Sequence, residues 1–272
     1  MFYDDPLRIV TLTTDFGTRD GYVGAMKGVI LERAPTARVI DIAHDVPRFD
    51  IAAGAYCLRQ ATPFYAEGTV HVAVIDPGVG TARRAVVVDN GRHLFVGPDN
   101  GVFSLVAPRP AGAWAIESSD FTRGQMSSTF HGRDVFAPAA AALAAGARPE
   151  DAGSPVELVP LLPAGGGRAD TPTVREDGSV QASVIYIDGF GNLITDCPAD
   201  AVVPGMSVQL PGEIPGTRAI ERISGTFGEV ERGQLLAYIG SAETVEVAVR
   251  EGSAAHELGL GVGAQVTLVP GG

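Results

Sequence analysis

Strand and helix signals alternate along the first 76 residues, and this order constrains the fold more than any other feature of the chain. Residues 8–15, 37–43 and 69–76 are rich in aliphatic and β-branched side chains and are predicted to be strands. Residues 20–34 and 50–61 lie between them and are predicted to be helices, the first because its apolar residues recur at helical spacing. This β-α-β-α-β order predicts a parallel sheet with helices on both faces and right-handed crossovers.

The chain continues with signals for a hairpin and for one more helix. Residues 85–101 contain two apolar runs around Asn90-Gly91, a dipeptide typical of a tight hairpin turn. Residues 133–146 are alanine-rich and end in Gly146, a residue typical of a helix C-terminus. Both elements extend the predicted α/β region.

The composition changes after this helix. Residues 147–172 are rich in Pro and Gly, as linkers are, and the remaining chain carries short β runs separated by turns. Such a pattern predicts a small β-barrel or sandwich. We therefore expect an α/β N-terminal domain over residues 1–160 with a mostly parallel sheet between helices, a linker over 161–172, and a smaller all-β C-terminal domain over 173–272.

Composition and charge exclude several classes of protein. The 272 residues are 45% hydrophobic with a mean hydropathy of +0.16, which indicates a folded globular chain. The net charge is −12 and Lys27 is the only lysine, so a nucleic-acid groove is not expected. No apolar run is long enough to span a membrane, and the N-terminus has two acids and no basic signal-peptide region. Cys57 and Cys197 lack a metal-binding motif, and we expect them to be reduced thiols of a cytoplasmic protein.

Two of the predicted strands end in carboxylates. Asp15 and Asp76 follow apolar runs, and glycines come within a few residues of each. Ligands of open parallel sheets bind beyond the carboxyl ends of the strands, and Pro77 favours an extended Asp76 whose side chain stays at the strand tip. Either aspartate could instead cap a loop by accepting backbone N–H groups. Two such ends on neighbouring strands favour a ligand site.

Two further segments carry polar groups that could take part in chemistry. His131 lies just before the predicted helix, where backbone N–H groups and the helix dipole favour an anion, although a lone histidine is more often structural. Asp188 and Asn192 flank glycines in the predicted β domain. An asparagine amide both donates and accepts, which suits reading a purine edge and equally suits a β-turn.

Other matches to known sequence motifs lack the residues that those motifs require. The tripeptide at 15–17 is found in kinases, but 14 upstream residues cannot hold the kinase Gly-rich loop and lysine strand. Arg83 stands where the dinucleotide-binding fingerprint needs its third glycine, and no HExxH, paired CxxC or Walker sequence is present. No metal site is therefore predicted from motifs, and the four remaining histidines show no metal-ligand spacing.

Five segments in order, "LTTDFGTRDGYVGAMKGVI", "VIDPGVGTARR", "VGPDNGVFS", "STFHGRDVFAPAA" and "IDGFGNLIT", resemble the S-adenosyl-L-methionine (SAM) hydroxide adenosyltransferases, or adenosine-forming SAM hydrolases. This family is related to the fluorinase and chlorinase enzymes. The resemblance runs from about residue 8 to about residue 268. It implies an enzyme that needs no cofactor, cleaves SAM with water to adenosine and methionine, and forms a homotrimer with active sites at subunit interfaces.

The resemblance also implies roles for individual residues. It implies that the catalytic set is Asp76, Arg83 and His131, with the family spacing selecting Arg83 over Arg84. It implies that the substrate contacts are Asp15 and Phe49 at the ribose, Asp188 at the methionine amino group, Asn192 at adenine, and Ser241 at the methionine carboxylate.

The chain departs from its halogenating relatives at several positions. A fluorinase has a tyrosine at the place of Asp76, a Tyr-Ser pair at His131-Gly132, and an insertion after the third strand that this chain lacks. These differences favour water over halide as the nucleophile. Ala242 replaces an arginine that helps to hold the substrate carboxylate in halogenases, and Arg250 stands where an asparagine is usual.

The sequence leaves three alternative functions and one mechanistic question open. The alternatives are a SAM halogenase, a SAM or adenosine sensor without catalysis, and a metallohydrolase. In the favoured reaction, Asp76 orients water and accepts its proton, while His131 bonds the same water and Arg83 holds the carboxylate. An arginine beside a carboxylate weakens it as a base, so the sequence leaves open whether Asp76 acts as a base or only as an orienting group.

Overall fold

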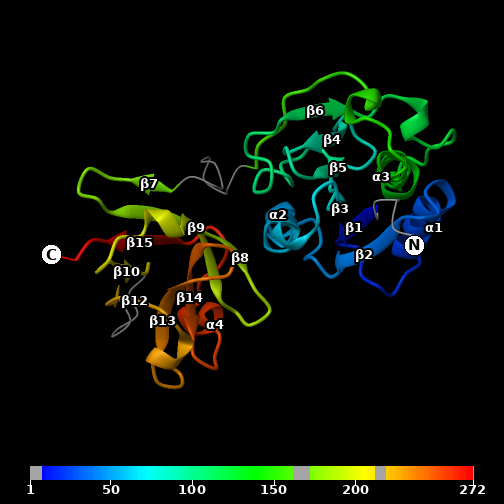
Figure 1. The fold of residues 1–272 in the computed structure, drawn as a ribbon. Coiled ribbons are helices and arrows are strands. Elements are labelled where there is room, and N and C mark those ends of the chain that lie inside the picture. Colours follow the sequence, from blue (N-terminus) through cyan, green and yellow to red (C-terminus); the bar gives the residue numbers. More distant parts are fainter. Residues whose placement is uncertain (1–7, 162–171, 212–218, 272) are drawn as a thin grey trace, which may run out of the picture. The chain divides into compact units, whose positions relative to one another are not determined.

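The computed structural model describes residues 8–161, 172–211 and 219–271, and it divides into two compact units, residues 1–161 and 162–272. The first is α/β and the second is mostly β, so the predicted two-domain fold class is confirmed (Figure 1). Most of the expected linker, residues 162–171, lies outside the described residues.

The first unit is built on a six-stranded sheet with the order β2-β1-β3-β5-β4-β6. The strands β2, β1, β3 and β5 run parallel, and β4 and β6 join them antiparallel. The hairpin expected at Asn90-Gly91 is the β4–β5 pair. The strand β6 was not predicted. The bounds are β1 Ile9–Thr14, β2 Arg38–Ala43, β3 Val70–Val74, β4 Ala85–Asp89, β5 Leu94–Pro98 and β6 Gly112–Ala115.

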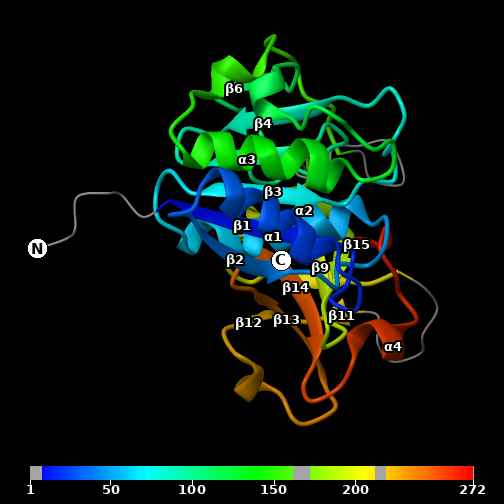
Figure 2. The same cartoon turned by 90° about the vertical axis from the view of Figure 1, so that its right-hand side faces the viewer.

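Helices cover both faces of this sheet, as the strand and helix order predicted. On one face α1 (Tyr22–Arg33) and α3 (Ala137–Ala144) pack over β1 and β3 (Figures 1 and 2). On the other face lies α2 (Ile51–Ala61), which begins with the Asp50 side chain accepting a hydrogen bond from the Ala53 N–H. The core between the sheet and the α1/α3 pair contains fully buried aliphatic side chains, among them Val10, Leu12, Met26, Ile30 and Val72.

The segment before α3 differs from the uninterrupted helix expected over residues 133–146. Residues Gly132–Phe136 form a π-helical turn, η3, closed by a hydrogen bond from the Ala137 N–H to the Gly132 carbonyl. Pro138 has no N–H to offer the Asp134 carbonyl, and that carbonyl accepts the Arg123 N–H instead. The helix ends as predicted, with Gly146 at a φ of 103° just beyond it. Such π-turns recur at functional sites, and this one begins directly after His131.

The second unit is a mostly antiparallel sheet that is nearly barrel-shaped, with the order β11-β10-β15-β8-β9-β14-β13-β12 and with β7 beside β8. Its core is formed by aliphatic side chains of the long strands. The bounds are β7 Thr173–Val174, β8 Val180–Ile187, β9 Leu193–Pro198, β10 Ser207–Gln209, β11 Ala219–Ile220, β12 Ile223–Ser224, β13 Leu235–Ile239, β14 Thr244–Val249, α4 Ala254–Leu258 and β15 Gln265–Val269.

Short 3₁₀ turns connect these elements at η1 Thr62–Phe64, η2 Ser119–Phe121, η4 Pro149–Ala152, η5 Ala199–Ala201 and η6 Phe227–Glu229. Within the described ranges, every helix is too short or too polar to cross a lipid bilayer.

Candidate active site

The carboxyl ends of β1 and β3 lie side by side and open onto one cavity. The two strands are parallel neighbours with Thr14 opposite Val74, so Asp15 and Asp76 leave the sheet at the same edge, as the sequence predicted. The cavity has a volume of about 460 Å³. It is lined by Asp15, Phe16, Asp20, Tyr22, Arg48, Phe49, Val74, Asp76, Val79, Thr129, Phe130, His131 and Gly132.

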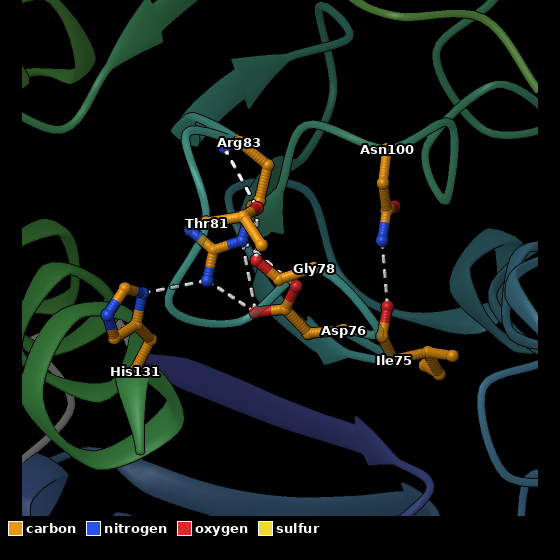
Figure 3. Close-up of polar contacts among 7 residues, drawn as sticks. All are labelled: Ile75, Asp76, Gly78, Thr81, Arg83, Asn100 and His131. Atoms are coloured by element: carbon orange, nitrogen blue, oxygen red, sulfur yellow. Dashed lines mark hydrogen bonds and ion pairs between the residues drawn. The ribbon is translucent and has the colours of Figure 1, made fainter. Parts of the chain in front are cut away.

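Asp76 is held by Arg83 in a nearly buried ion pair (Figure 3). The Nε of Arg83 donates to Oδ1 at 2.9 Å and to Oδ2 at 3.1 Å, and its Nη2 also donates to Oδ2. The side chains of Asp76 and Arg83 are only 5% and 10% exposed. A charge pair so shielded from water is fixed in geometry, because each partner would be costly to leave unpaired.

The turn that joins the two partners depends on a glycine. Gly80 has a φ of 77°, and a Cβ there would come within 2.6 Å of the Ser128 carbonyl oxygen. The Thr81 hydroxyl donates to the Gly78 carbonyl at 2.7 Å and closes the turn. This tight turn brings Arg83, seven residues after Asp76 in the sequence, back over the Asp76 carboxylate.

Arg83 also fixes His131, which comes from the start of η3. Its Nη2 donates to His131 Nδ1 at 2.8 Å (Figure 3). A guanidinium only donates, so Nδ1 accepts and the proton of the neutral ring lies on Nε2. Burial lowers the pKa of His131 and the Arg83 charge lowers it further, while Asp76 and Asp134 oppose the shift. His131 is therefore a neutral N–H donor at the cavity, beside a carboxylate acceptor.

The neighbouring arginine has a different role. Arg84 pairs with Asp99, through Nε at 2.9 Å and Nη2 at 2.5 Å, and its Nη2 also donates to the Glu157 carbonyl. Of the two arginines, Arg83 is the one that pairs with Asp76.

Asp15 is held more loosely than Asp76. Its Oδ2 accepts the Phe49 N–H at 2.9 Å, and no other hydrogen bond to its carboxylate occurs among the described residues. Phe49 has a φ of 66°, which is uncommon for a bulky residue, and its side chain is 67% exposed at the cavity. The two residues expected at the ribose therefore lie in contact and on the same cavity.

The cavity also contains residues that the sequence analysis did not select. Phe16, Tyr22 and Phe130 form an aromatic cluster with ring centroids 5.1 to 6.1 Å apart. Tyr22 lies in the segment predicted to be a helix because of its apolar residues, but it is 50% exposed. Asp20 and Arg48 were also missed. Their loop positions carry no periodic signal, so only the fold identifies them as cavity residues.

The remaining expected substrate contacts lie in the second unit. Asp188 Oδ1 accepts the Phe190 and Asn192 N–H groups at 2.9 Å each, and its Oδ2 accepts the Asn192 side-chain amide at 2.8 Å. Asp188 and Asn192 thus form the β8–β9 turn, where they are hydrogen-bonded to each other. Ser241 is exposed in the turn between β13 and β14.

Possible metal ligands do not cluster in the part of the chain that the structure describes, where no group of three or more His, Cys, Asp or Glu side chains could hold an ion. Both cysteines are unpaired. The cavity brings together a fixed carboxylate and a neutral imidazole, which together can orient a water molecule and accept its proton.

Known proteins share this fold and sequence along nearly their whole length. The (R)-S-adenosyl-L-methionine hydrolase of Salinispora tropica is 40% identical over 98% of this chain and 99% of its own length. The protein of that name from Thermus thermophilus is 43% identical over 97% and 100%. A fluorinase of Actinopolyspora mzabensis is 25% identical over 95% and 96%.

A solved structure of similar fold and two family models also match this chain. A conserved protein of Thermotoga maritima superposes with a TM-score of 0.82 at 33% identity, covering 96% of this chain and 99% of its own. The N-terminal domain model of the SAM hydroxide adenosyltransferases matches residues 10–153, and the C-terminal domain model matches residues 182–267. The chain belongs to the SAM hydroxide adenosyltransferase family.

Proposed function

We propose that this protein hydrolyses SAM to adenosine and L-methionine. The observation that carries the proposal is the Asp76–Arg83–His131 cluster, which lies at a cavity of a chain about 40% identical to proteins named SAM hydrolases. In this reaction water attacks C5′ of the ribose. A C–O bond forms, the C5′–S bond breaks with its electron pair going to sulfur, and methionine leaves as a neutral thioether.

The difficult part of the reaction is the activation of water. A sulfonium is a good leaving group and needs no acid, whereas water must be positioned and relieved of a proton. Asp76 accepts one hydrogen of the water and then its proton, and the Nε2–H of His131 donates to one oxygen lone pair. The other lone pair is left to face C5′. Arg83 is already bound to both residues and keeps this arrangement fixed.

The substrate contacts follow the same proposal. Asp15 and Phe49 bind the ribose, Asp188 the methionine amino group, Asn192 adenine and Ser241 the methionine carboxylate. The last three lie in the second unit, and we propose a homotrimer in which each active site is formed between subunits. The enzyme uses no metal or cofactor and acts in the cytoplasm, in keeping with two unpaired cysteines.

The test is a product analysis. Purified protein treated with EDTA is incubated with SAM, with and without high chloride, and the products are separated by chromatography. Equal amounts of adenosine and methionine, independent of chloride, are expected. A chloride-dependent 5′-chloroadenosine product would show a halogenase, intact SAM bound to the protein would show a sensor, and activity lost with EDTA would show a metallohydrolase.

A further inference from the structure

A chain of polar side chains leads from the surface to the residue before Asp15. Lys27 Nζ donates to Asp41 Oδ2 at 2.6 Å, and Asp41 Oδ1 lies 2.9 Å from His44 Nε2, a close contact without the geometry of a hydrogen bond. His44 Nδ1 is 2.9 Å from the Thr14 hydroxyl. Thr14 is fully buried and His44 is 6% exposed, so their contact is shielded from water. Burial raises the pKa of the Asp41 carboxyl, but the nearby Lys27 and His44 outweigh this effect and leave that pKa below its ordinary value.

The innermost residues of this series of side chains, Thr14 and His44, bind the backbone on both sides of Asp15. The Thr14 hydroxyl accepts the Phe16 N–H at 3.3 Å, across Asp15. The Gly17 N–H donates to the His44 carbonyl at 2.7 Å, so the same histidine holds the strand end through its ring and the following turn through its backbone. The Asp15 carboxylate therefore projects from a loop whose flanks are both tied to His44.

The loop that starts at His44 also carries the second ribose residue. Phe49 lies five residues further on, and its N–H donates to the Asp15 carboxylate. A φ of 66° is strained for phenylalanine and persists only if the surrounding contacts hold it. The anchoring of this loop at His44 supplies such a contact, so one side chain supports both Asp15 and Phe49.

We propose that Thr14 and His44 are positioning residues for substrate binding, which hold Asp15 and Phe49 in the orientation that receives the ribose. The inference rests on the proposed SAM hydrolysis only for the identity of the ligand. Neither residue touches the reacting atoms. Loss of the Thr14–His44 contact therefore weakens binding of the nucleoside and leaves the Asp76–Arg83–His131 cluster intact.

The strand β1 provides a matched control for this proposal. Thr13 is also fully buried, but its hydroxyl has no partner among the residues described. Replacing a buried threonine by valine keeps its shape and removes only the hydroxyl. Thr14→Val thus loses the two contacts that the proposal invokes, the one with His44 and the one with the Phe16 N–H, whereas Thr13→Val loses neither.

The test compares Thr14→Val, Thr14→Ser and Thr13→Val with the wild type. We expect Thr14→Val to raise the KM for SAM and the Kd for adenosine by about tenfold, with kcat changed by less than about threefold. Thr14→Ser should restore both constants, and Thr13→Val should resemble the wild type. Equal effects of the two valine variants, or no change with Thr14→Val, would overturn the proposal.

A second variant keeps the test decisive if Thr14→Val does not fold. Asp41 is 42% exposed and lies at the outer end of the chain, so Asp41→Ala threatens the core less. It should raise the Kd for adenosine by about threefold, because Asp41 lies against the His44 ring. An unchanged Kd would contradict the proposed positioning role of His44. Calorimetry with adenosine needs no turnover, so absent hydrolysis by the wild type would refute the proposed function alone.

Discussion

The two strand ends at the cavity hold their carboxylates in different ways. At the end of β3, both oxygens of Asp76 accept hydrogen bonds from Arg83, and the pair is nearly buried. At the end of β1, Asp15 is partly buried and, within the described part of the chain, accepts a single backbone N–H through Oδ2. The first carboxylate is fixed by a charge, whereas the second is fixed by backbone and keeps an oxygen available.

This difference separates two tasks. A charge pair that is fixed and shielded from water suits a step in which a proton moves, because its geometry does not have to reorganise. An available carboxylate oxygen suits recognition of ribose hydroxyls, which donate hydrogen bonds. Changes at the β3 end should therefore alter turnover, and changes at the β1 end should alter binding.

The largest effect is expected from Asp76→Asn. The amide keeps the shape of the side chain but cannot accept a proton from water, so kcat should fall by about a hundredfold or more. Binding of SAM, measured by calorimetry, should persist. Turnover close to that of the wild type would remove Asp76 from the reaction.

Asp89 provides the matched control for that variant. It ends β4 in the same sheet, does not line the cavity, and accepts the Gly91 N–H through Oδ1. An asparagine at this position can accept the same bond. Asp89→Asn should therefore leave kcat and KM unchanged, and a loss equal to that of Asp76→Asn would indicate a general effect on the sheet.

Arg83→Lys should give the next largest effect. Lysine can pair with Asp76, but it lacks the planar fork that also reaches His131 Nδ1. We expect kcat to fall by about tenfold or more. Arg84→Lys is the control, because Arg84 pairs with Asp99 and not with Asp76 or His131. Equal losses in steady-state assays of the two variants would contradict a specific role for Arg83.

Asp15→Ala tests the opposite end of the comparison. Removal of this carboxylate should raise the Kd for adenosine by about tenfold, since hydrogen bonds to charged groups are among the stronger ones. The Asp76 cluster is untouched, so kcat at saturating SAM should change by less than about threefold. Calorimetry that finds the affinity unchanged would remove Asp15 from the binding site.

The sheet and the placement of both carboxylates at its edge could be predicted from the sequence. The alternation of strands and helices identified a parallel sheet, and parallel neighbours put Asp15 and Asp76 at one edge whatever their loops do. The hairpin at Asn90-Gly91 followed from local turn chemistry. The short strand β6 could not be predicted, because the four residues "GAWA" carry too little alternation to indicate a strand.

The details of the site depend on contacts between distant segments. Arg83 meets His131 across 48 residues, and that contact determines which ring nitrogen carries the proton. The π-turn after His131 follows from Pro138 and from the Arg123 N–H that takes its place at the Asp134 carbonyl. A sequence pattern can place His131 near a helix start, but it cannot show what its ring faces.

The smallest effect is expected from pH, and it should differ between the two strand ends. His131 acts as a neutral ring, and burial together with Arg83 lowers its pKa below the ordinary value near 6.5. A lowered pKa keeps the neutral form dominant below pH 6.5, so kcat should hold its plateau there and decline only at lower pH, when a proton on Nδ1 would oppose the Arg83 donor. The Kd for adenosine, determined at the Asp15 end, should change less over this range.

Rate and calorimetric profiles of the same samples, measured against pH, test both statements. A decline of kcat already above pH 6.5 would contradict the neutral-ring assignment, and a Kd that follows kcat would mean that the two ends do not work separately.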